Sequence, residues 1–254
     1  MNIAILWFGE YRNSDIAMKF NNFDKLRKNH NVTDFISTWE NRISEKSPEY
    51  DIVNDYYKNE CVTELHYNKF LDISNCKIHK KNELNFIDDI EIKDCTVNSM
   101  SFHLKYLINE IKNKNFDLVF LLRTDVVYNI DFDFIENFNF DDKIVVQTCI
   151  YKKEKLEFLH DLFFISNFKT IEKFIDNILF DIEGGSHYGW SKIINDLKIK
   201  CISVSDIVNK NYSSFIVRYF MRKSINLLDK ITDEVADKQR EVSEMVYPQF
   251  QKLI

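Results

Sequence analysis

Glycine and proline are scarce in this chain of 254 residues, which contains 4 and 2 of them. Because tight hairpins usually need these residues, we expect strands that are joined through helices, and not a β-sandwich. Long hydrophobic runs are also missing, and the N-terminal apolar segment spans only about six residues without a small-residue cleavage site. We therefore expect a first strand there, and neither a signal peptide nor a membrane span.

The chain lacks a long basic run and carries a formal net charge of -6. This balance argues against nucleic acid as the main partner. The 5 cysteines are odd in number, widely spread and never arranged as CxxC, so they suggest neither a zinc knuckle nor a disulfide framework. We expect reduced thiols in a cytoplasmic protein.

Short apolar runs alternate with segments of helical spacing along most of the chain. Residues between Asn41 and Cys95 predict a moderate amount of helix and short strands, and the chain after Ser213 has a helical pattern. Strand alternating with helix predicts an α/β fold with a mainly parallel, Rossmann-type sheet and helices on both faces. The expected strands are Ile3–Phe8, Val32–Trp39, Phe116–Leu122, Ile144–Thr148, Asp161–Ser166 and Cys201–Val204, and the expected helices are Asp15–Lys28, Val97–Lys112, Phe168–Leu179 and Tyr188–Leu197.

One apolar strand ends abruptly on Arg123, Thr124 and Asp125, in the stretch FDLVFLLRTDVVYN. Ligands of open parallel sheets bind beyond the carboxyl ends of the strands. Asp125 is therefore placed to hold Mg²⁺ or Mn²⁺, and Arg123 to bond phosphates. A turn capped by Asp125, with Arg123 as its surface partner, fits the position equally well. In both interpretations we expect Asp125 at a solvent-facing strand end.

The segment LVFLLRTDVVY resembles the R-[TPS]-D-[VLI] signature of small GT-A-type glycosyltransferases that build surface polysaccharides and lipopolysaccharides. In that signature the Asp takes the place of the DxD motif of nucleotide-sugar enzymes. Other segments resemble the family in the same order: IAILWFGEYRN its first strand and loop, DFISTW its second strand, and HDLFFISNFKTIEKF and GWSKIINDLKIKCISV its later strands and helices. The resemblance covers roughly residues 1–206.

The resemblance implies a site for a nucleotide-diphosphate sugar. It places Gly9 and Arg12 in the loop that contacts the donor nucleotide, where glycine permits close backbone approach and arginine meets a phosphate. Thr38 ends the second strand at the same edge, beside Trp39, for which stacking on a base and packing in the core are both open. The other implied donor-binding residues are Arg123, Thr124 and Asp125.

The resemblance also implies a carboxylate base and a divalent cation. Asp161 is the leading candidate for deprotonating the acceptor hydroxyl in an inverting transfer, and Glu183 is the second. The alternative for Asp161 is a backbone-bonded residue at the start of a strand. Asp125 and His187 are the candidate ligands of Mn²⁺ (manganese) or Mg²⁺. Because Arg-Thr-Asp lacks the first carboxylate of DxD, it argues against a strict metal requirement.

The expected organisation is a GT-A-like catalytic domain, residues 1–206, with a helical C-terminal extension, residues 207–254, packed on it. The expected function is sugar transfer from a nucleotide-diphosphate sugar to a glycan or lipid-linked saccharide. The basic, amphipathic C-terminal segment offers three options: peripheral membrane contact, subunit pairing or plain packing. The alternative function is a non-catalytic nucleotide- or glycan-binding α/β module. A Rossmann-type methyltransferase is disfavoured, because the first strand is followed by a single glycine.

Overall fold

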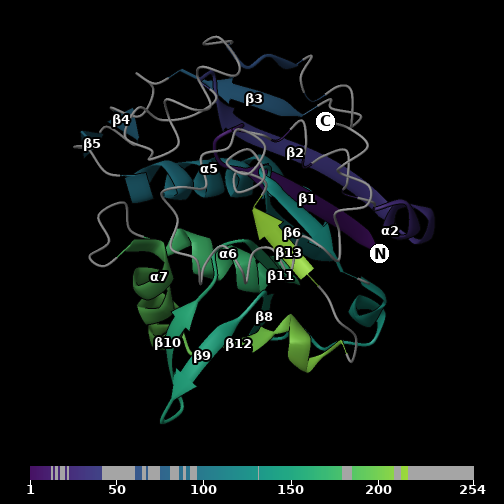
Figure 1. The fold of residues 1–254 in the computed structure, drawn as a ribbon, viewed down its shortest axis with the longest axis vertical. Coiled ribbons are helices and arrows are strands. Elements are labelled where there is room, and N and C mark those ends of the chain that lie inside the picture. Colours follow the sequence, from purple (N-terminus) through teal and green to yellow (C-terminus); the bar gives the residue numbers. More distant parts are fainter. Residues whose placement is uncertain are drawn as a thin grey trace, which may run out of the picture.

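The computed structural model describes residues 1–12, 14, 17, 21, 23–41, 61–64, 67, 75–80, 86–87, 90–91, 96–130, 132–178, 185–208 and 213–216. Its centre is a seven-stranded sheet in the order β12-β8-β11-β6-β1-β2-β3 (Figure 1). Six of these strands run parallel, and β11 alone runs antiparallel to its neighbours β6 and β8. The seven strands are β1 (Asn2–Phe8), β2 (Asn31–Trp39), β3 (Cys76–His79), β6 (Leu118–Arg123), β8 (Lys143–Val146), β11 (Phe163–Asn167) and β12 (Lys200–Ser203).

Three two-stranded ribbons and several helices surround this sheet. The ribbons are β4 (Phe86–Ile87) with β5 (Ile90–Glu91), β9 (Cys149–Lys152) with β10 (Lys155–Leu159), and β7 (Val126–Asn129) with β13 (Ser213–Ile216). The helices are α2 (Asp24–Asn29), α5 (Thr96–Ile111), α6 (Phe168–Asp176) and α7 (Gly185–Asp196), with 3₁₀ turns η2 (Phe132–Glu136) and η3 (Val204–Asp206). No helix among the described residues is long and apolar enough to cross a membrane.

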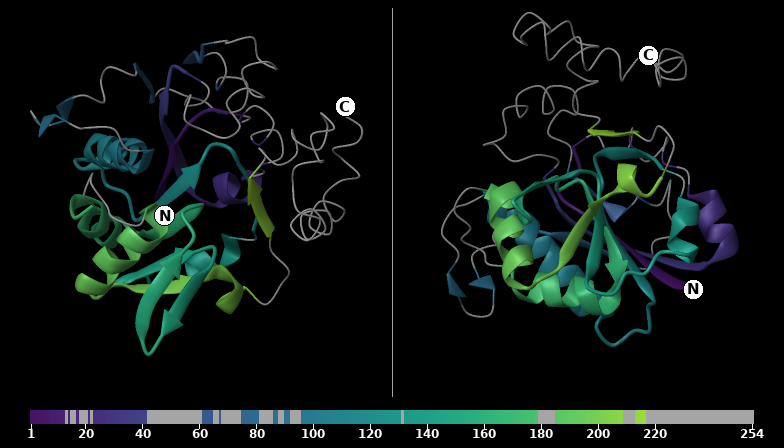
Figure 2. Two further views of the ribbon diagram at one scale, coloured as in Figure 1. Left: turned by 60° about the vertical axis from the view of Figure 1, so that its left-hand side comes forward. Right: turned by 90° about the horizontal axis from the view of Figure 1, so that it is seen from below.

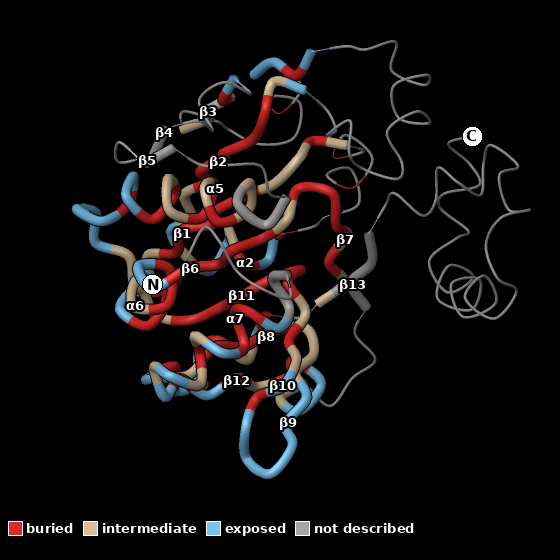
Figure 3. Tube along the Cα trace, turned by 90° about the vertical axis from the view of Figure 1, so that its left-hand side faces the viewer, coloured by how far each residue is buried: buried red, intermediate tan, exposed pale blue. Residues whose placement is uncertain are grey.

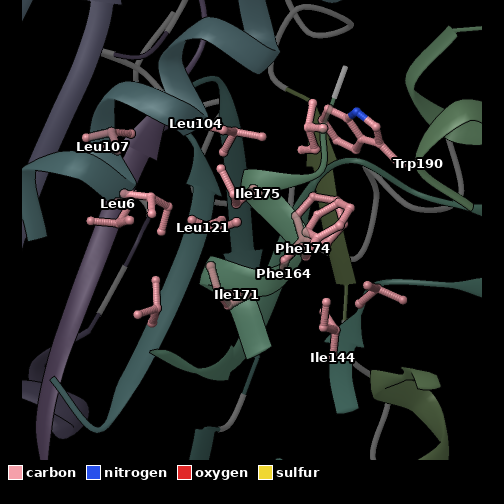
Figure 4. Close-up of a cluster of buried hydrophobic side chains, with 14 of the residues drawn as sticks. Leu6, Leu104, Leu107, Leu121, Ile144, Phe164, Ile171, Phe174, Ile175 and Trp190 are labelled. Atoms are coloured by element: carbon pink, nitrogen blue, oxygen red, sulfur yellow. The ribbon is translucent and has the colours of Figure 1, made fainter. Parts of the chain in front are cut away.

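Each face of the sheet buries its own layer of apolar side chains, because successive strand residues point to opposite faces. On one face, Leu6 and Leu121 pack against Leu104 of α5, Phe174 of α6 and Trp190 of α7 (Figure 4). On the other face, β-strand residues such as Trp7 and Phe120 pack against the apolar residues of α2 and η2. Figure 2 shows α5, α6 and α7 on one side of the sheet and α2 on the other.

The predicted fold class is confirmed: a mainly parallel α/β sheet has helices on both faces. The expected strands and helices after Val97 lie within a few residues of the observed ones. Helix α6 begins where the sequence predicts it, since the Asn167 side chain caps the helix by accepting a hydrogen bond from the Thr170 amide at 2.8 Å. Of the helix expected over Asp15–Lys28, the described part contains α2, which begins at Asp24.

Two local features differ from simple sequence patterns. The β9–β10 hairpin turns without glycine, with Lys153 and Glu154 at φ 48° and 66° in its place. This hairpin projects from the sheet, and its tip is exposed (Figure 3). The helix expected after Ser213 is wrong for the first residues of that segment, because they form the strand β13, which pairs with β7. The remainder of the predicted C-terminal extension, beyond residue 216, lies outside the described residues.

Candidate active site

The parallel strands bring most of the predicted site residues to one edge of the sheet. Strands β1, β2 and β6 run in the same direction, so the residues that follow Phe8, Trp39 and Arg123 lie at a common carboxyl edge. Strand β11 runs the opposite way and enters the sheet from this edge, with Phe163 opposite Leu122. The segment that contains Asp161, just before β11, therefore lies at the carboxyl edge of β1, β2 and β6.

The loop after β1 has an unusual backbone. Gly9 has φ 108°, a region that side chains with a Cβ rarely adopt, and Arg12 has φ 42° although it is not glycine. A Cβ built on Gly9 would meet no heavy atom of any described residue within 4 Å. Among the described residues, the backbone at Gly9 thus borders open space, as the predicted close approach of a ligand requires. Strained residues of this kind often mark functional loops.

Two threonines fix this loop from the neighbouring strands. The Thr38 hydroxyl at the end of β2 donates to the Gly9 carbonyl at 2.8 Å. The Thr124 hydroxyl donates to the Glu10 carbonyl at 3.2 Å. Both threonines are fully buried, so their roles in this structure are to hold the loop. Sequence reasoning predicted that they bind the donor, and in the structure they bond the backbone of the loop at Gly9 and Glu10.

An arginine–carboxylate cluster occupies the centre of the edge; we use this name for Glu10, Arg12, Arg123, Asp125 and Asp161. Arg123 donates two hydrogen bonds to Asp125, with Nε–Oδ1 and Nη2–Oδ2 distances of 2.9 Å. The other arginine, Arg12, lies 3.5 Å from Asp125 Oδ2 and donates from Nε to Glu10 at 2.8 Å. Arg123 Nη1 also lies 3.6 Å from Asp161 Oδ1. Five side chains from three separate segments are thereby linked.

Burial changes the interpretation of Asp125. Its exposed fraction is only 2%, so the expectation of a solvent-facing carboxylate is wrong. The chain turns at Thr124 and Asp125 and continues directly into β7, which covers the strand end. Burial by itself would lower the pKa of Arg123, but the charges of Asp125 and Asp161 outweigh it, so the net effect raises that pKa. Asp125 and Arg123 therefore form a charged, bidentate, nearly buried pair.

Tyr128 in β7 holds Arg123 in place, and sequence reasoning missed it. Its hydroxyl accepts a hydrogen bond from the Arg123 amide at 2.7 Å and lies 2.8 Å from the Leu162 carbonyl. Burial raises the pKa of Tyr128, so the hydroxyl keeps its proton at neutral pH. Glu10, the partner of Arg12, was missed as well. The only sequence signal for either residue is its nearness to Arg12 or Arg123 in the chain.

Tyr67 supplies a buried hydroxyl at this edge. Burial raises its pKa, while the side chains of Thr38 and Thr124 lie close enough to lower it in part. The hydroxyl nevertheless makes no hydrogen bond to any described residue. Because an unbonded buried hydroxyl costs roughly 1–3 kcal/mol, a polar group of a ligand or a water molecule beside it would stabilise the site.

Trp39 and its neighbours form a separate, buried group. The Trp39 ring stacks on Phe102 at a centroid distance of 5.1 Å, and its Nε1 donates to Ser99 Oγ at 2.5 Å. Both contacts are with α5, and the ring is 7% exposed. Of the two options left open for Trp39, the structure favours core packing over stacking on a base.

The described residues do not fit a divalent cation at Asp125. Both of its oxygens accept hydrogen bonds from Arg123, and a guanidinium beside them repels a metal ion. Within the described ranges, no group of three His, Cys, Asp or Glu side chains could hold a metal. The second predicted ligand, His187, lies in α7, but its side chain is outside the description, and Glu183 lies outside the described residues altogether.

Comparisons with known proteins give distant structural similarities. No family model and no curated protein matches the sequence. Similar solved structures include the apo form of the glycosyltransferase GlyE of Streptococcus pneumoniae TIGR4, at 11% identity and a TM-score of 0.38, over 79% of this chain and 44% of that one. The chain thus spans less than half the length of GlyE.

Another similar structure is the galactosyltransferase LgtC in complex with donor and acceptor sugar analogues. It is 11% identical, with a TM-score of 0.38 over 79% of this chain and 72% of LgtC. Similarities at this distance do not assign the chain to a family.

Proposed function

We propose that this protein is a glycosyltransferase that moves a sugar from a nucleotide-diphosphate sugar to a glycan or lipid-linked saccharide acceptor. The observation that carries the proposal is the arginine–carboxylate cluster at the carboxyl edge of β1, β2 and β6, beside open space at Gly9. Open α/β sheets bind nucleotides at this edge. The site lies in residues 1–206, the proposed catalytic domain.

In this proposal Arg12 meets the diphosphate of the donor. The cluster holds two guanidinium groups and three carboxylates, a formal excess of one negative charge. An anionic donor must therefore replace one of the carboxylates as the partner of an arginine. The Arg12–Glu10 pair is the better candidate for that exchange, because both side chains are 15% exposed whereas that of Asp125 is 3% exposed. The Arg123–Asp125 pair then acts as a rigid support that orients the Arg12 side chain. Arg12 stabilises the charge that develops on the leaving diphosphate.

Asp161 is the proposed general base. As the acceptor hydroxyl attacks the anomeric carbon, its proton passes to the Asp161 carboxylate, and the bond to the nucleoside diphosphate breaks. Asp161 is 7% exposed and lies 3.6 Å from Arg123, so it stands at the margin of the cluster. This single displacement inverts the configuration at the anomeric carbon. Glu183 remains the second candidate for this role.

The proposed donor binding makes no use of a cation at Asp125. We therefore expect differential scanning fluorimetry against a panel of nucleotide sugars to show stabilisation by at least one of them. Adding Mn²⁺ or Mg²⁺ should leave that stabilisation nearly unchanged. A stabilisation that appears only with Mn²⁺ would contradict a purely ion-paired role for Asp125.

A transfer assay with the stabilising donor tests the base. The variant Asp161→Asn should lower turnover by about two to four orders of magnitude while donor binding survives. Glu183→Gln serves as the competing variant, and Asp133→Asn, a surface carboxylate paired with Lys25, as the matched control. Near-normal turnover in Asp161→Asn and in Glu183→Gln would rule out both bases.

One observation favours the alternative, a non-catalytic nucleotide- or glycan-binding module. Arg123 and Asp125 bind each other through two hydrogen bonds, as in a structural ion pair. Binding of a nucleotide sugar without hydrolysis or transfer to any acceptor would establish that alternative. The proposed location in the cytoplasm accords with the free thiols of Cys61, Cys76, Cys149 and Cys201.

A further inference from the structure

A row of aromatic rings runs from the surface to His160, the residue directly before Asp161 of the arginine–carboxylate cluster; we call Tyr188, Phe158 and His160 the aromatic row. The Phe158 ring centroid lies 5.9 Å from that of Tyr188 and 5.2 Å from that of His160. Among the large apolar side chains that the structure describes, Tyr188 is the most exposed, at 60%. Phe158 and His160 are partly exposed. An exposed tyrosine of this kind is not explained by packing.

The row is joined to the candidate site through the chain. Tyr188 lies on α7 and Phe158 on β10, two elements that stand beside each other in Figure 1. His160 directly precedes Asp161, the proposed base, which contacts Arg123. On β9, Ile150 lies opposite Phe158 and is 52% exposed, which widens the apolar surface. The row therefore ends one residue before the carboxylate that would accept the proton of an attacking acceptor hydroxyl.

The chemistry of the row fits a saccharide. Successive rings are inclined at 68° and 76°, so they form a stepped surface and not a flat stack. A flat nucleobase would find only one ring to stack on, whereas the puckered C–H faces of sugar rings can pack against several inclined rings. The hydroxyl of the exposed Tyr188 adds a hydrogen-bonding group at the rim.

We propose that the aromatic row is the binding surface for the acceptor, and that the acceptor portion bound there is an uncharged oligosaccharide. This inference rests on the proposed function and deepens it. The rings of Tyr188 and Phe158 bring no formal charge of their own, so they select for apolar sugar faces and hydroxyl groups, not for acidic sugars. The sugar nearest Asp161 presents the hydroxyl that is glycosylated.

The test uses the full chain on a printed array of neutral and acidic oligosaccharides, followed by titration of the bound ones. Tyr188→Ala removes the most exposed ring, and Tyr188→Phe removes only its hydroxyl. Tyr151→Phe is the matched control, because Tyr151 is an exposed tyrosine of the β9–β10 hairpin. It directly follows Ile150 in β9, so its side chain points to the opposite face of the hairpin. Its hydroxyl bonds the backbone of Cys201.

We expect the wild-type chain to bind neutral oligosaccharides. Tyr188→Ala should weaken that binding at least about tenfold and Tyr188→Phe by less, whereas Tyr151→Phe should leave it unchanged. Binding of nucleotide sugars, measured by fluorimetry, should be the same in all three variants.

Equal oligosaccharide binding by wild type and Tyr188→Ala, or no binding to any neutral oligosaccharide, would overturn the inference. So would a loss in Tyr188→Ala of sedimentation with phosphatidylcholine–phosphatidylglycerol vesicles or of self-association, because the row would then serve a membrane or a second copy. These failures are distinct from failure of the proposed function. If the chain binds no nucleotide sugar but Tyr188→Ala still loses oligosaccharide binding, transfer is disproved and the sugar-binding row stands.

Discussion

At the scale of single residues, the pairing of Arg123 with Asp125 explains why an apolar strand finishes on a charged pair. The two side chains neutralise each other where β6 turns into β7, and this allows both to be buried. A buried ion pair is weak evidence for stability, but removing one partner leaves the other charge unpaired and is costly. The pair is therefore a structural anchor of the candidate site, and in the proposed function it acts on the donor through Arg12.

Asp125→Asn should destabilise the protein, contrary to what a solvent-facing carboxylate would predict. Losing one charge of the buried pair should lower the free energy of unfolding by roughly 3 kcal/mol, which is a drop in Tm of roughly 6–12 °C for a chain of this size. Asp133→Asn, which breaks an exposed ion pair with Lys25, should cost less than about 1 kcal/mol. Calorimetry on both variants checks this, and equal Tm values for both would show that Asp125 is not an anchor.

A second residue-scale feature is the buried histidine pair beneath Trp39. Ser37 Oγ lies 2.7 Å from His103 Nδ1 and 3.0 Å from His79 Nε2, and all three side chains are almost fully buried. Burial, and then the neighbouring His79, hold the pKa of His103 well below its ordinary value of 6.5. Folded His103 therefore stays neutral at pH values at which the unfolded chain already binds a proton.

This difference in protonation makes the folded state less stable as pH falls. Above pH 6.5 neither state protonates His103, and as pH falls below that value the unfolded state alone gains a proton, so stability falls. The contribution reaches at most about 2 kcal/mol at pH 5, because one proton is worth 1.4 kcal/mol per pH unit. In urea titrations at pH 7 and pH 5, His103→Gln should lose less stability on acidification than the wild type. An equal loss in both would contradict the shifted pKa.

At the scale of elements, the β9–β10 hairpin turns without the residues that such turns prefer. Lys153 and Glu154 both have positive φ, as a two-residue type I′ loop requires, whereas Asn-Gly would adopt this conformation with little strain. The sequence contains no signal for this turn, because its residues are typical of an exposed helix or loop. The packing of Leu156 and Leu159 into the core outweighs the low turn propensity of Lys153 and Glu154.

Replacing Lys153 by Asn and Glu154 by Gly should stabilise the protein. Relief of the left-handed strain should raise the free energy of unfolding by about 1 kcal/mol, or Tm by roughly 2–4 °C. The control Lys155→Gly places glycine in the adjoining strand and should lower stability by about 0.5–1 kcal/mol. Urea unfolding compares the three proteins, and a lower stability of the Asn-Gly variant would show that the turn is not strained.

Other elements were predictable to the extent that their signals are local. The strands Asn2–Phe8 and Leu118–Arg123 are apolar on both faces, and α5 has buried residues at helical spacing, so their sequences specify them. Strand β3 is short and contains Lys77 and His79, and it exists because β2 offers it a parallel edge to pair with. Strand β13 likewise depends on β7. A local sequence pattern does not predict strands whose formation depends on a distant pairing partner.

At the scale of the whole molecule, the sheet topology assembles the site from segments far apart in the sequence. Residues 9–12, 38 and 123–125 meet because three parallel strands end at one edge, and Asp161 joins them because β11 runs the other way. The meeting of the first three was predictable from strand polarity alone. The mutual neutralisation of Arg12, Arg123 and their carboxylates was not, because it depends on side-chain distances that no pattern encodes.

The central claim is that the donor nucleotide binds at this carboxyl edge. The most direct measurement is a crystal structure of the full chain with the nucleoside diphosphate that stabilises it most in fluorimetry. We predict a diphosphate in contact with Arg12 and beside the backbone of Gly9, with the Arg123–Asp125 pair intact. A diphosphate bound elsewhere, for example in the cavity of about 440 Å³ between α2 and η2 near Lys25 and His30, would contradict the claim.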